Sequence, residues 1–115
     1  MKNLENLTLK TREKAAIKDA TALLKERFSV QEVILFGSKA RGDSDRDSDI
    51  DLLLLTNQSL HWRQRHAIVD ALFDIEMKHD VMISIVVNTV NDWRHGVCTE
   101  LPIHEEISRE GVTIQ

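Results

Sequence analysis

The first third of the chain changes from a helical pattern to a short, continuous apolar run. Apolar residues recur at spacings of three and four, with Lys and Glu between them: Ile17, Ala20, Leu24 and Phe28. This spacing predicts a helix over Thr11–Phe28. The next segment, Val30–Phe36, ends in four consecutive apolar residues that Gly37 stops, so it predicts a buried strand.

The middle third begins with a polar stretch and then returns to apolar patterns. Residues 38–41 fit one helical turn, and Asp43–Ser48 has no apolar residue, as expected of a loop. Ile50–Leu55 predicts a second strand, followed by turn-forming residues. Ser59 is expected to cap a helix that continues to about Lys78. One apolar face of this helix is marked by Ile68, Val69, Leu72, Phe73 and Ile75.

The last third predicts one more strand and two shorter helices. Val81–Val87 is β-branched and apolar, which favours a third strand, and Asn88–Val90 is expected to form a turn. Asn91 or Asp92 is a candidate cap for a short helix. Pro102 marks the start of a last helix, which a short final strand follows.

This order of elements defines the expected fold class. Only a polar stretch of about a dozen residues separates the first two strands, so these strands do not form a regular βαβ unit. We therefore expect an α+β fold, with a small mixed β-sheet and helices packed mainly on one side. Because the chain shows no repeat or linker, residues 1–115 are expected to form one domain.

Composition and charge narrow the range of functions. The 115 residues are 42% hydrophobic and 30% charged, which is enough for one core. The net charge of −4 argues against general nucleic-acid binding, which draws on clustered Lys and Arg. Cys98 is the only cysteine, so no internal disulfide can form. Because the chain lacks a signal-peptide pattern and an apolar run of roughly 20 residues, we expect a cytoplasmic protein without a membrane partner.

The segment from Gly37 to Leu54 approaches two known loop patterns and matches neither. It nearly follows the P-loop pattern, but Asp43 replaces the lysine that reaches the terminal phosphates, and a carboxylate there would repel phosphate. Alternating aspartates also suggest a calcium loop, which needs Gly at its sixth position and Glu at its twelfth. Ser48 and Leu54 stand at those positions, so both patterns are excluded.

A Gly-Ser turn directly after a strand is the first feature that remains. Gly37 permits a tight turn and a close approach of the backbone to a ligand. The amide groups at the start of the following helical turn can bind anions, and Ser38 adds a hydroxyl donor. Arg41 is placed either to support the same phosphates or to brace the loop. Gly37, Ser38 and Arg41 are therefore the candidate phosphate-binding residues.

Two aspartates at the start of the second strand are the other feature. Asp49 and Asp51 are two residues apart, so on a strand their side chains face the same side, roughly 6.6 Å apart. Two such carboxylates beside an apolar run repel each other unless a cation lies between them. Mg²⁺ prefers carboxylate and phosphate oxygens, and Asp49 and Asp51 are therefore candidate metal ligands.

The combination resembles the signature of the DNA polymerase β-like nucleotidyltransferases: Gly-Ser, then Ala-Arg-Gly, then Ser-Asp-Ile-Asp-Leu. The chain length and the closing segment also resemble a minimal nucleotidyltransferase, so the resemblance covers nearly the whole chain. It implies that an acceptor hydroxyl attacks the α-phosphate of a nucleoside triphosphate, with Mg²⁺ as cofactor, and that pyrophosphate leaves. It further implies that Gly37 and Ser38 hold the triphosphate and that Asp49 and Asp51 hold the metal.

The family also implies a third carboxylate on a later strand, which serves as a metal ligand and as a base. Asp80, Met82 and Ser84 would share one face of the third strand, and Asp80 is the only carboxylate among them. Asp80 is therefore the candidate third catalytic and metal-binding residue. A register that places Met82 at this position instead would leave the site without a base.

Three interpretations of function follow from the resemblance. The first is an enzyme that transfers AMP from ATP to a hydroxyl on a partner, such as a small helical HEPN-domain toxin. The second is an antitoxin that neutralises a HEPN partner by binding alone, and the third is a nucleotide sensor. Since the chain is too small to carry its own acceptor-binding subdomain, the acceptor site is expected from a partner or from self-association. Apolar residues of the last third are candidates for that interface: Val97, Ile103 and Ile107.

Overall fold

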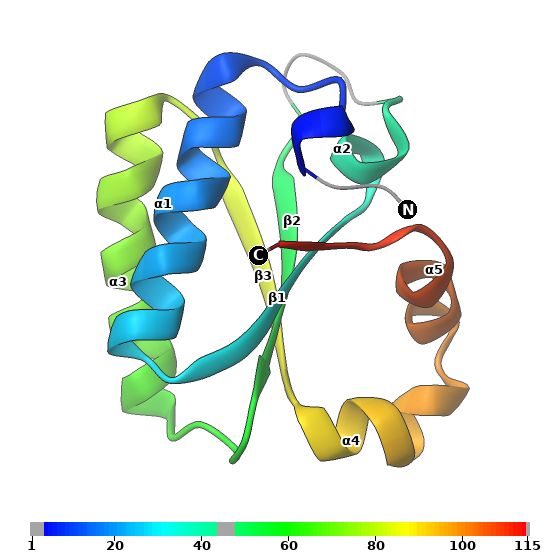
Figure 1. The fold of residues 1–115 in the computed structure, drawn as a ribbon. Helices are drawn as coiled ribbons and strands as arrows, with labels where there is room; N and C mark the ends of the chain where they lie inside the picture. The colour runs from blue at the N-terminus through cyan, green and yellow to red at the C-terminus, as the bar shows by residue number, and fades with distance from the viewer. Residues whose placement is uncertain (1–3, 44–47, 115) are drawn as a thin grey trace.

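A computed structural model describes residues 4–43 and 48–114, and Figure 1 shows its fold. The helices of these residues are η1 (Leu4–Asn6), α1 (Thr11–Arg27), α2 (Ser38–Arg41), α3 (Trp62–His79), α4 (Val90–His95), η2 (Val97–Glu100) and α5 (Pro102–Glu110). The strands are β1 (Val30–Phe36), β2 (Ile50–Thr56), β3 (Ile83–Thr89) and β4 (Val112–Ile114). The predicted order of helices and strands is confirmed.

These strands form one mixed sheet in the order β3-β2-β1-β4. β1 runs antiparallel to both β2 and β4, whereas β2 and β3 run parallel. The parallel pair requires a crossover long enough to reverse the chain twice, and α3 supplies it. The α+β class with a mixed sheet is therefore confirmed.

The two faces of the sheet carry helices of different length. The long helices α1 and α3 lie side by side on one face, and the short helices α4 and α5 lie on the other (Figure 1). Along β2, Ile50, Leu52 and Leu54 pack toward α1 and α3, while Leu53 and Leu55 pack toward α4 and α5. Burial on both faces explains why β2 reads as a continuous apolar run instead of an alternating one.

Several predicted boundaries were wrong by a few residues. α3 begins at Trp62, and its cap is His61, whose Nδ1 accepts a hydrogen bond from the Arg63 amide; Ser59 lies outside the helix. The expected turn at residues 88–90 is absent, because β3 continues to Thr89 and the Thr89 hydroxyl caps α4 by accepting from the Asp92 amide. The cap is therefore neither of the two residues proposed for it.

The apolar face expected for α3 was too wide. Ile68, Leu72 and Ile75 are buried against the sheet, but Val69 and Phe73 are more than half exposed. A helix lying on a sheet buries one stripe of its surface, and these two residues lie outside that stripe. Within residues 4–43 and 48–114, no helix is both long and apolar enough to cross a membrane.

Candidate active site

The Gly-Ser turn lies directly beside the second aspartate of the pair. Phe36, the last residue of β1, is paired with Asp51 of β2, so the chain leaves the sheet next to the Asp51 side chain. Gly37 has φ 76° and ψ −158°, a conformation that L side chains rarely adopt. A Cβ atom at Gly37 would also collide with the Asp51 carboxylate oxygen. Both the backbone and the space around it therefore require glycine at this turn.

Asp49, Asp51 and Ser84 meet at the start of β2 and β3. Asp51 is level with Ser84 across the parallel pair, and the Ser84 hydroxyl donates a hydrogen bond of 2.8 Å to Asp49 Oδ2. Asp51 alternates along β2 with residues that pack toward α1 and α3, so its carboxylate faces the side of α4 and α5. The sequence prediction that the two aspartates share one face agrees with this arrangement.

The surroundings of Asp51 destabilise the charged form of its carboxyl group. Burial raises the pKa of Asp51 above its ordinary range, and the nearby Asp49 carboxylate raises it further, while the Arg41 guanidinium acts in the opposite direction. A bound cation would relieve both the burial cost and the repulsion. The donor set of two carboxylates with a hydroxyl beside them fits a hard, oxygen-preferring cation such as Mg²⁺.

Arg41 braces the turn against the C-terminal helix. Its guanidinium contacts Asp43 at 3.1 Å, Glu110 at 3.1 Å and Glu106 at 3.7 Å. Hydrogen bonds to Asp43 and then Glu110 raise the pKa of Arg41. Of the two roles considered for this residue, bracing is the one present in the structure, and the guanidinium is still close enough to Asp51 to act on its carboxyl.

Lys39, between Ser38 and Arg41, points into the protein. Its side chain is 3% exposed and forms an ion pair of 2.5 Å with Glu13 of α1. Burial alone would raise the pKa of Glu13, but hydrogen bonds from Lys39 and from the Lys10 amide hold it below its ordinary value. Sequence reasoning missed this pair. The available signal was that Glu13 stands at helical spacing from the buried Ile17.

Asp80 lies apart from the carboxylate pair in the structure, and its role as a third metal ligand stays a prediction. It is the C-cap of α3 in the left-handed conformation, with φ 55° and ψ 53°. It lines a separate hollow with Arg12, Glu13 and Ser48. No cluster of three or more His, Cys, Asp or Glu side chains able to hold a metal occurs in the described residues. The left-handed turn breaks the alternation that would have placed Asp80 on the face of Asp51.

Ser84, and neither Asp80 nor Met82, is the residue of β3 level with Asp51. The carbonyl of Met82, the alternative candidate, accepts a hydrogen bond of 2.8 Å from the Ile50 amide, which leaves Ser84 as the residue level with Asp51. The sequence prediction grouped Asp80, Met82 and Ser84 on one face, and of these three Ser84 is the residue that lies beside the two aspartates.

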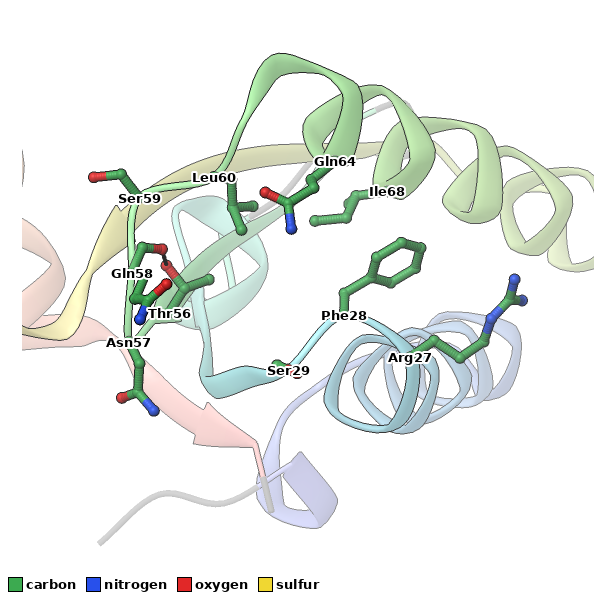
Figure 2. Close-up of a pocket in the computed structure, with 10 residues that line it drawn as sticks. All are labelled: Arg27, Phe28, Ser29, Thr56, Asn57, Gln58, Ser59, Leu60, Gln64 and Ile68. Atoms are coloured by element: carbon green, nitrogen blue, oxygen red, sulfur yellow. Dashed lines mark hydrogen bonds between the residues drawn. The ribbon is translucent and has the colours of Figure 1, made fainter.

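A hollow of about 400 Å³ opens at the opposite end of the same strands (Figure 2). It lies where β1 begins and β2 ends, and the Phe28 ring points across it toward Gln64 and Ile68. The Thr56 hydroxyl donates a 2.7 Å hydrogen bond to the Gln58 carbonyl at its rim. None of the described residues that line this hollow carries a carboxylate, so it is distinct from the candidate active site.

A family model matches most of this chain. The model described as Polymerase beta, Nucleotidyltransferase matches residues 18–110, a range that includes the Gly37 turn, both aspartates and Ser84. The resemblance inferred from the motif is therefore confirmed by a match that extends over α1 to α5.

Three archaeal relatives have names that refer to one activity. The chain is 36% identical over 70 residues to a Methanocaldococcus jannaschii protein with the provisional name protein adenylyltransferase MJ0141, covering 61% of this chain and 69% of that protein. It is 32% identical over 79 residues to MJ0604 of the same organism, also provisionally named a protein adenylyltransferase, covering 67% and 74%. A match to the protein adenylyltransferase MntA of Thermococcus cleftensis is 52% identical over 31 residues, 27% of this chain and 31% of MntA.

Two solved structures have the same fold. A protein provisionally described as a minimal nucleotidyltransferase superposes with a TM-score of 0.61 at 27% identity, covering 96% of this chain and 95% of that one. A toxin–antitoxin structure with AMP-PNP superposes with a TM-score of 0.59 at 20% identity, covering 90% and 72%, and shares the fold alone. From the family match and the fold together, this chain belongs to the minimal nucleotidyltransferases of the polymerase β family.

Proposed function

We propose that this protein is an adenylyltransferase that moves AMP from ATP to a hydroxyl group on another protein. The observation that carries the proposal is the contact between the Gly37 turn and Asp51, with Asp49 on the same face. A phosphate-binding turn and a pair of carboxylates at this distance can hold the two parts of a metal–nucleotide complex. The names of the relatives, protein adenylyltransferases, favour AMP as the group and protein as the acceptor.

The residues divide the work of the reaction. The amide groups and hydroxyl at Gly37–Ser38 would bind the triphosphate, and Asp49 and Asp51 would hold Mg²⁺. When bound, the metal supplies charge neutralisation at the phosphates. The acceptor oxygen forms a bond to the α-phosphorus, the bond from that phosphorus to pyrophosphate breaks, and the hydroxyl proton passes to a base or to solvent. Positioning and charge neutralisation account for most of such catalysis.

The direct test is transfer of label from α-labelled ATP to candidate acceptor proteins in the presence of Mg²⁺. The Asp49→Asn, Asp51→Asn double variant should lose transfer, because both carboxylates that would hold the metal are neutralised. Asp70→Asn, Asp74→Asn is a matched control, since these two acids are exposed on α3, on the face of the sheet away from the site. Equal transfer of label by the wild type and the Asp49, Asp51 double variant would refute the proposal that this protein is an adenylyltransferase.

A second candidate function is an antitoxin that acts by binding, and Ser84 is the observation that favours it. A hydroxyl in place of the third carboxylate leaves the site without a strong base among the described residues. A structural relative is a toxin–antitoxin structure, and a small helical HEPN-domain protein is the partner we propose. If the Asp49, Asp51 double variant still neutralises a HEPN protein encoded in the adjacent reading frame, then binding, not transfer, is the function.

Replacing Ser84 by Asp separates the two candidates further. The new carboxylate would lie beside Asp49 and level with Asp51, where it can accept a proton or a metal. A slow enzyme that lacks its base should then gain transfer activity. An efficient enzyme should lose activity or stay unchanged, and a pure binding protein should show no transfer in either form. Calorimetry with ATP and Mg²⁺ tests a nucleotide sensor, which binds without turnover.

A further inference from the structure

The outer face of α3 carries an apolar stripe that the fold leaves uncovered. Trp62, Val69, Phe73 and Met77 are 60%, 54%, 57% and 69% exposed. At 100° per residue these four positions share one side of the helix. Together they expose roughly 400–500 Å², the size at which a patch on a monomer is often functional. We name these four residues the α3 stripe.

A comparison with α1 shows that the stripe is specific to α3. Both helices pack on the same face of the sheet (Figure 1), but no large apolar side chain of α1 is exposed. The outer surface of α1 therefore exposes polar side chains to water, whereas that of α3 also exposes large apolar side chains. α1 and α3 cover the face of the sheet opposite to the one that carries the Asp51 carboxylate. The α3 residues are therefore separate from the candidate active site.

Charges beside the stripe are segregated along the helix. Arg63 shares one flank of the stripe with Asp70 and Asp74, and Arg65 shares the other flank with Glu76, because spacings of seven and eleven residues return to the same side. On both flanks the basic residue is near the N-terminus of α3 and the acids are toward its C-terminus. This order opposes the helix dipole, which favours acids at the N-terminus, and Asp70 and Asp74 repel each other at i, i+4.

The two ends of the stripe also differ in shape. Trp62 projects at the N-terminal end, where Arg63 lies against its indole ring, with 5.3 Å from guanidinium carbon to ring centre. At the C-terminal end a hollow of about 240 Å³ is lined by Phe73, Met77, Val81 and Met82, among others. One end therefore presents a large aromatic side chain, and the other end presents an apolar recess.

We propose that the α3 stripe is a surface for self-association, in which two copies pair through antiparallel α3 helices about a twofold axis. An antiparallel arrangement brings the basic half of each helix against the acidic half of its partner. It also brings Trp62 of each copy to the apolar hollow of the other. A twofold interface requires such a self-complementary surface, and a buried Trp in a recess is a common source of binding energy.

The expected dimer is of moderate strength and leaves both active sites accessible. An 18-residue helix is about 27 Å long, and one pair of such helices gives an interface near the lower end of the specific range, for which micromolar dissociation constants are usual. Because α3 lies on the face of the sheet away from Asp51, both carboxylate pairs would stay open to acceptors.

Sedimentation velocity of the full chain over two decades of concentration tests the proposal. The wild type should shift from monomer to dimer, and Phe73→Glu should raise the dissociation constant at least tenfold. Because Phe73 is exposed, this variant should fold as the wild type does, which a thermal melt checks. Val97→Glu is the control, since Val97 is 86% exposed on η2, which directly follows α4, a helix on the other face of the sheet from α3 (Figure 1). A wild type that stays monomeric, or a dimer lost in Val97→Glu and kept in Phe73→Glu, would overturn the proposal.

Charge reversal tests the pairing directly. The Arg63→Glu, Arg65→Glu variant has an α3 flanked only by acids, and the Asp70→Lys, Asp74→Lys variant has mainly basic flanks. Each should be monomeric alone, because both halves of its α3 then carry charge of mainly one sign and each half repels the opposite half of a second copy. A mixture of the two should form a heterodimer, and the gain should decrease with salt. Two variants that each dimerise like the wild type, or a mixture that stays monomeric, would exclude the charge-paired arrangement.

Discussion

Two carboxylates beside the same short helix have opposite electrostatic settings. Glu13 meets the Lys39 ammonium, and its pKa lies below the ordinary value in spite of burial. Asp51 meets the Asp49 carboxylate, and its pKa lies above the ordinary value. Gly37 and Lys39, two residues apart, contact these two acids on opposite faces of the sheet. The fold thus provides a cation for the first acid and leaves the second to be neutralised from outside.

This contrast separates Glu13, which joins two helices, from Asp51, which we propose serves a bound ligand. A buried charge that is fully paired holds elements together, here α2 against α1, and its removal costs stability. A half-buried charge set beside a like charge costs stability, and proteins retain such an arrangement where a ligand uses it. Mutations at the two acids should therefore change stability in opposite directions.

The largest expected effect is on nucleotide transfer. Asp51→Asn should lower transfer on the order of 10³-fold, because one of the two carboxylates that would hold the metal is lost. The same variant should unfold at a higher temperature than the wild type in the absence of metal, since the repulsion from Asp49 is removed. Transfer assays and metal-free thermal melts measure the two effects. If Asp51→Asn is less stable than the wild type without metal, then Asp51 and Glu13 do not affect stability in opposite directions.

Glu13→Gln and Lys39→Met should each destabilise the protein by about 3 kcal/mol, because each leaves the other member of a buried ion pair without its partner. The double variant Glu13→Gln, Lys39→Met should recover much of this loss, since no unpaired charge remains. Denaturant unfolding of the four proteins gives the coupling between the two sites. Additive losses would show that the pair is less important than its burial indicates.

Gly37→Ala should cost about 1–3 kcal/mol, since it combines a positive φ with a collision against Asp51. Gly42→Ala is the matched control, because Gly42 also has a positive φ, but among the described residues no atom beyond its chain neighbours lies within 4 Å of the place that its Cβ would occupy. The difference between the two losses isolates the cost of displacing the Asp51 carboxylate. Equal losses in denaturant unfolding would mean that the close approach adds nothing.

Mg²⁺ or Mn²⁺ should stabilise the wild type and leave Asp51→Asn nearly unchanged. At a metal concentration ten times the dissociation constant the gain is about 1.4 kcal/mol, since only the folded chain presents both carboxylates together. Thermal melts with and without metal measure this gain. Glu13→Gln serves as the comparison and should keep the metal response, and a response retained by Asp51→Asn would place the metal elsewhere.

The smallest effect is the pH dependence of metal-free stability. Asp51 has a raised pKa in the folded state, so the folded chain binds this proton more tightly, and its contribution to the unfolding free energy falls as pH rises from about 3.8 through the folded value. Glu13 has a lowered pKa, so its contribution is lost as pH falls below about 4.5 toward the folded value. Melts of Asp51→Asn and Glu13→Gln across acidic pH should therefore differ from the wild type with opposite slopes.

Local patterns in the sequence were sufficient for the part of the site that lies close together along the chain. Gly37, Asp49 and Asp51 were identified because a turn after a strand and a spacing of two on the next strand each determine a side-chain direction. The mixed sheet followed from the short polar connection between β1 and β2. These features depend on neighbours within about fifteen residues, where pattern and geometry agree.

The features that sequence reasoning missed depend on a conformation or on a distant partner. The left-handed conformation of Asp80 ends α3 and delays β3 until Ile83, which brings Ser84 to Asp51 and keeps Asp80 away. A positive φ at a residue other than glycine is uncommon, so nothing in the sequence indicated that the alternation of β3 does not extend back to Asp80. The ion pair between Glu13 and Lys39 joins residues far apart in the chain, which periodicity alone does not connect.

The double burial of β2 also determines how quickly the active site can open by fluctuation. Amide protons of a strand that is paired on both edges and covered on both faces exchange with solvent only when the whole domain unfolds. Asp51 is carried by this strand, between Ile50 and Leu52, which are almost completely buried. Hydrogen exchange should therefore find Asp51, the carboxylate that we propose binds the metal, on the slowest-exchanging element of the protein. A destabilising mutation elsewhere would lower the fraction of molecules that are active, while each folded molecule keeps the same geometry at Asp51.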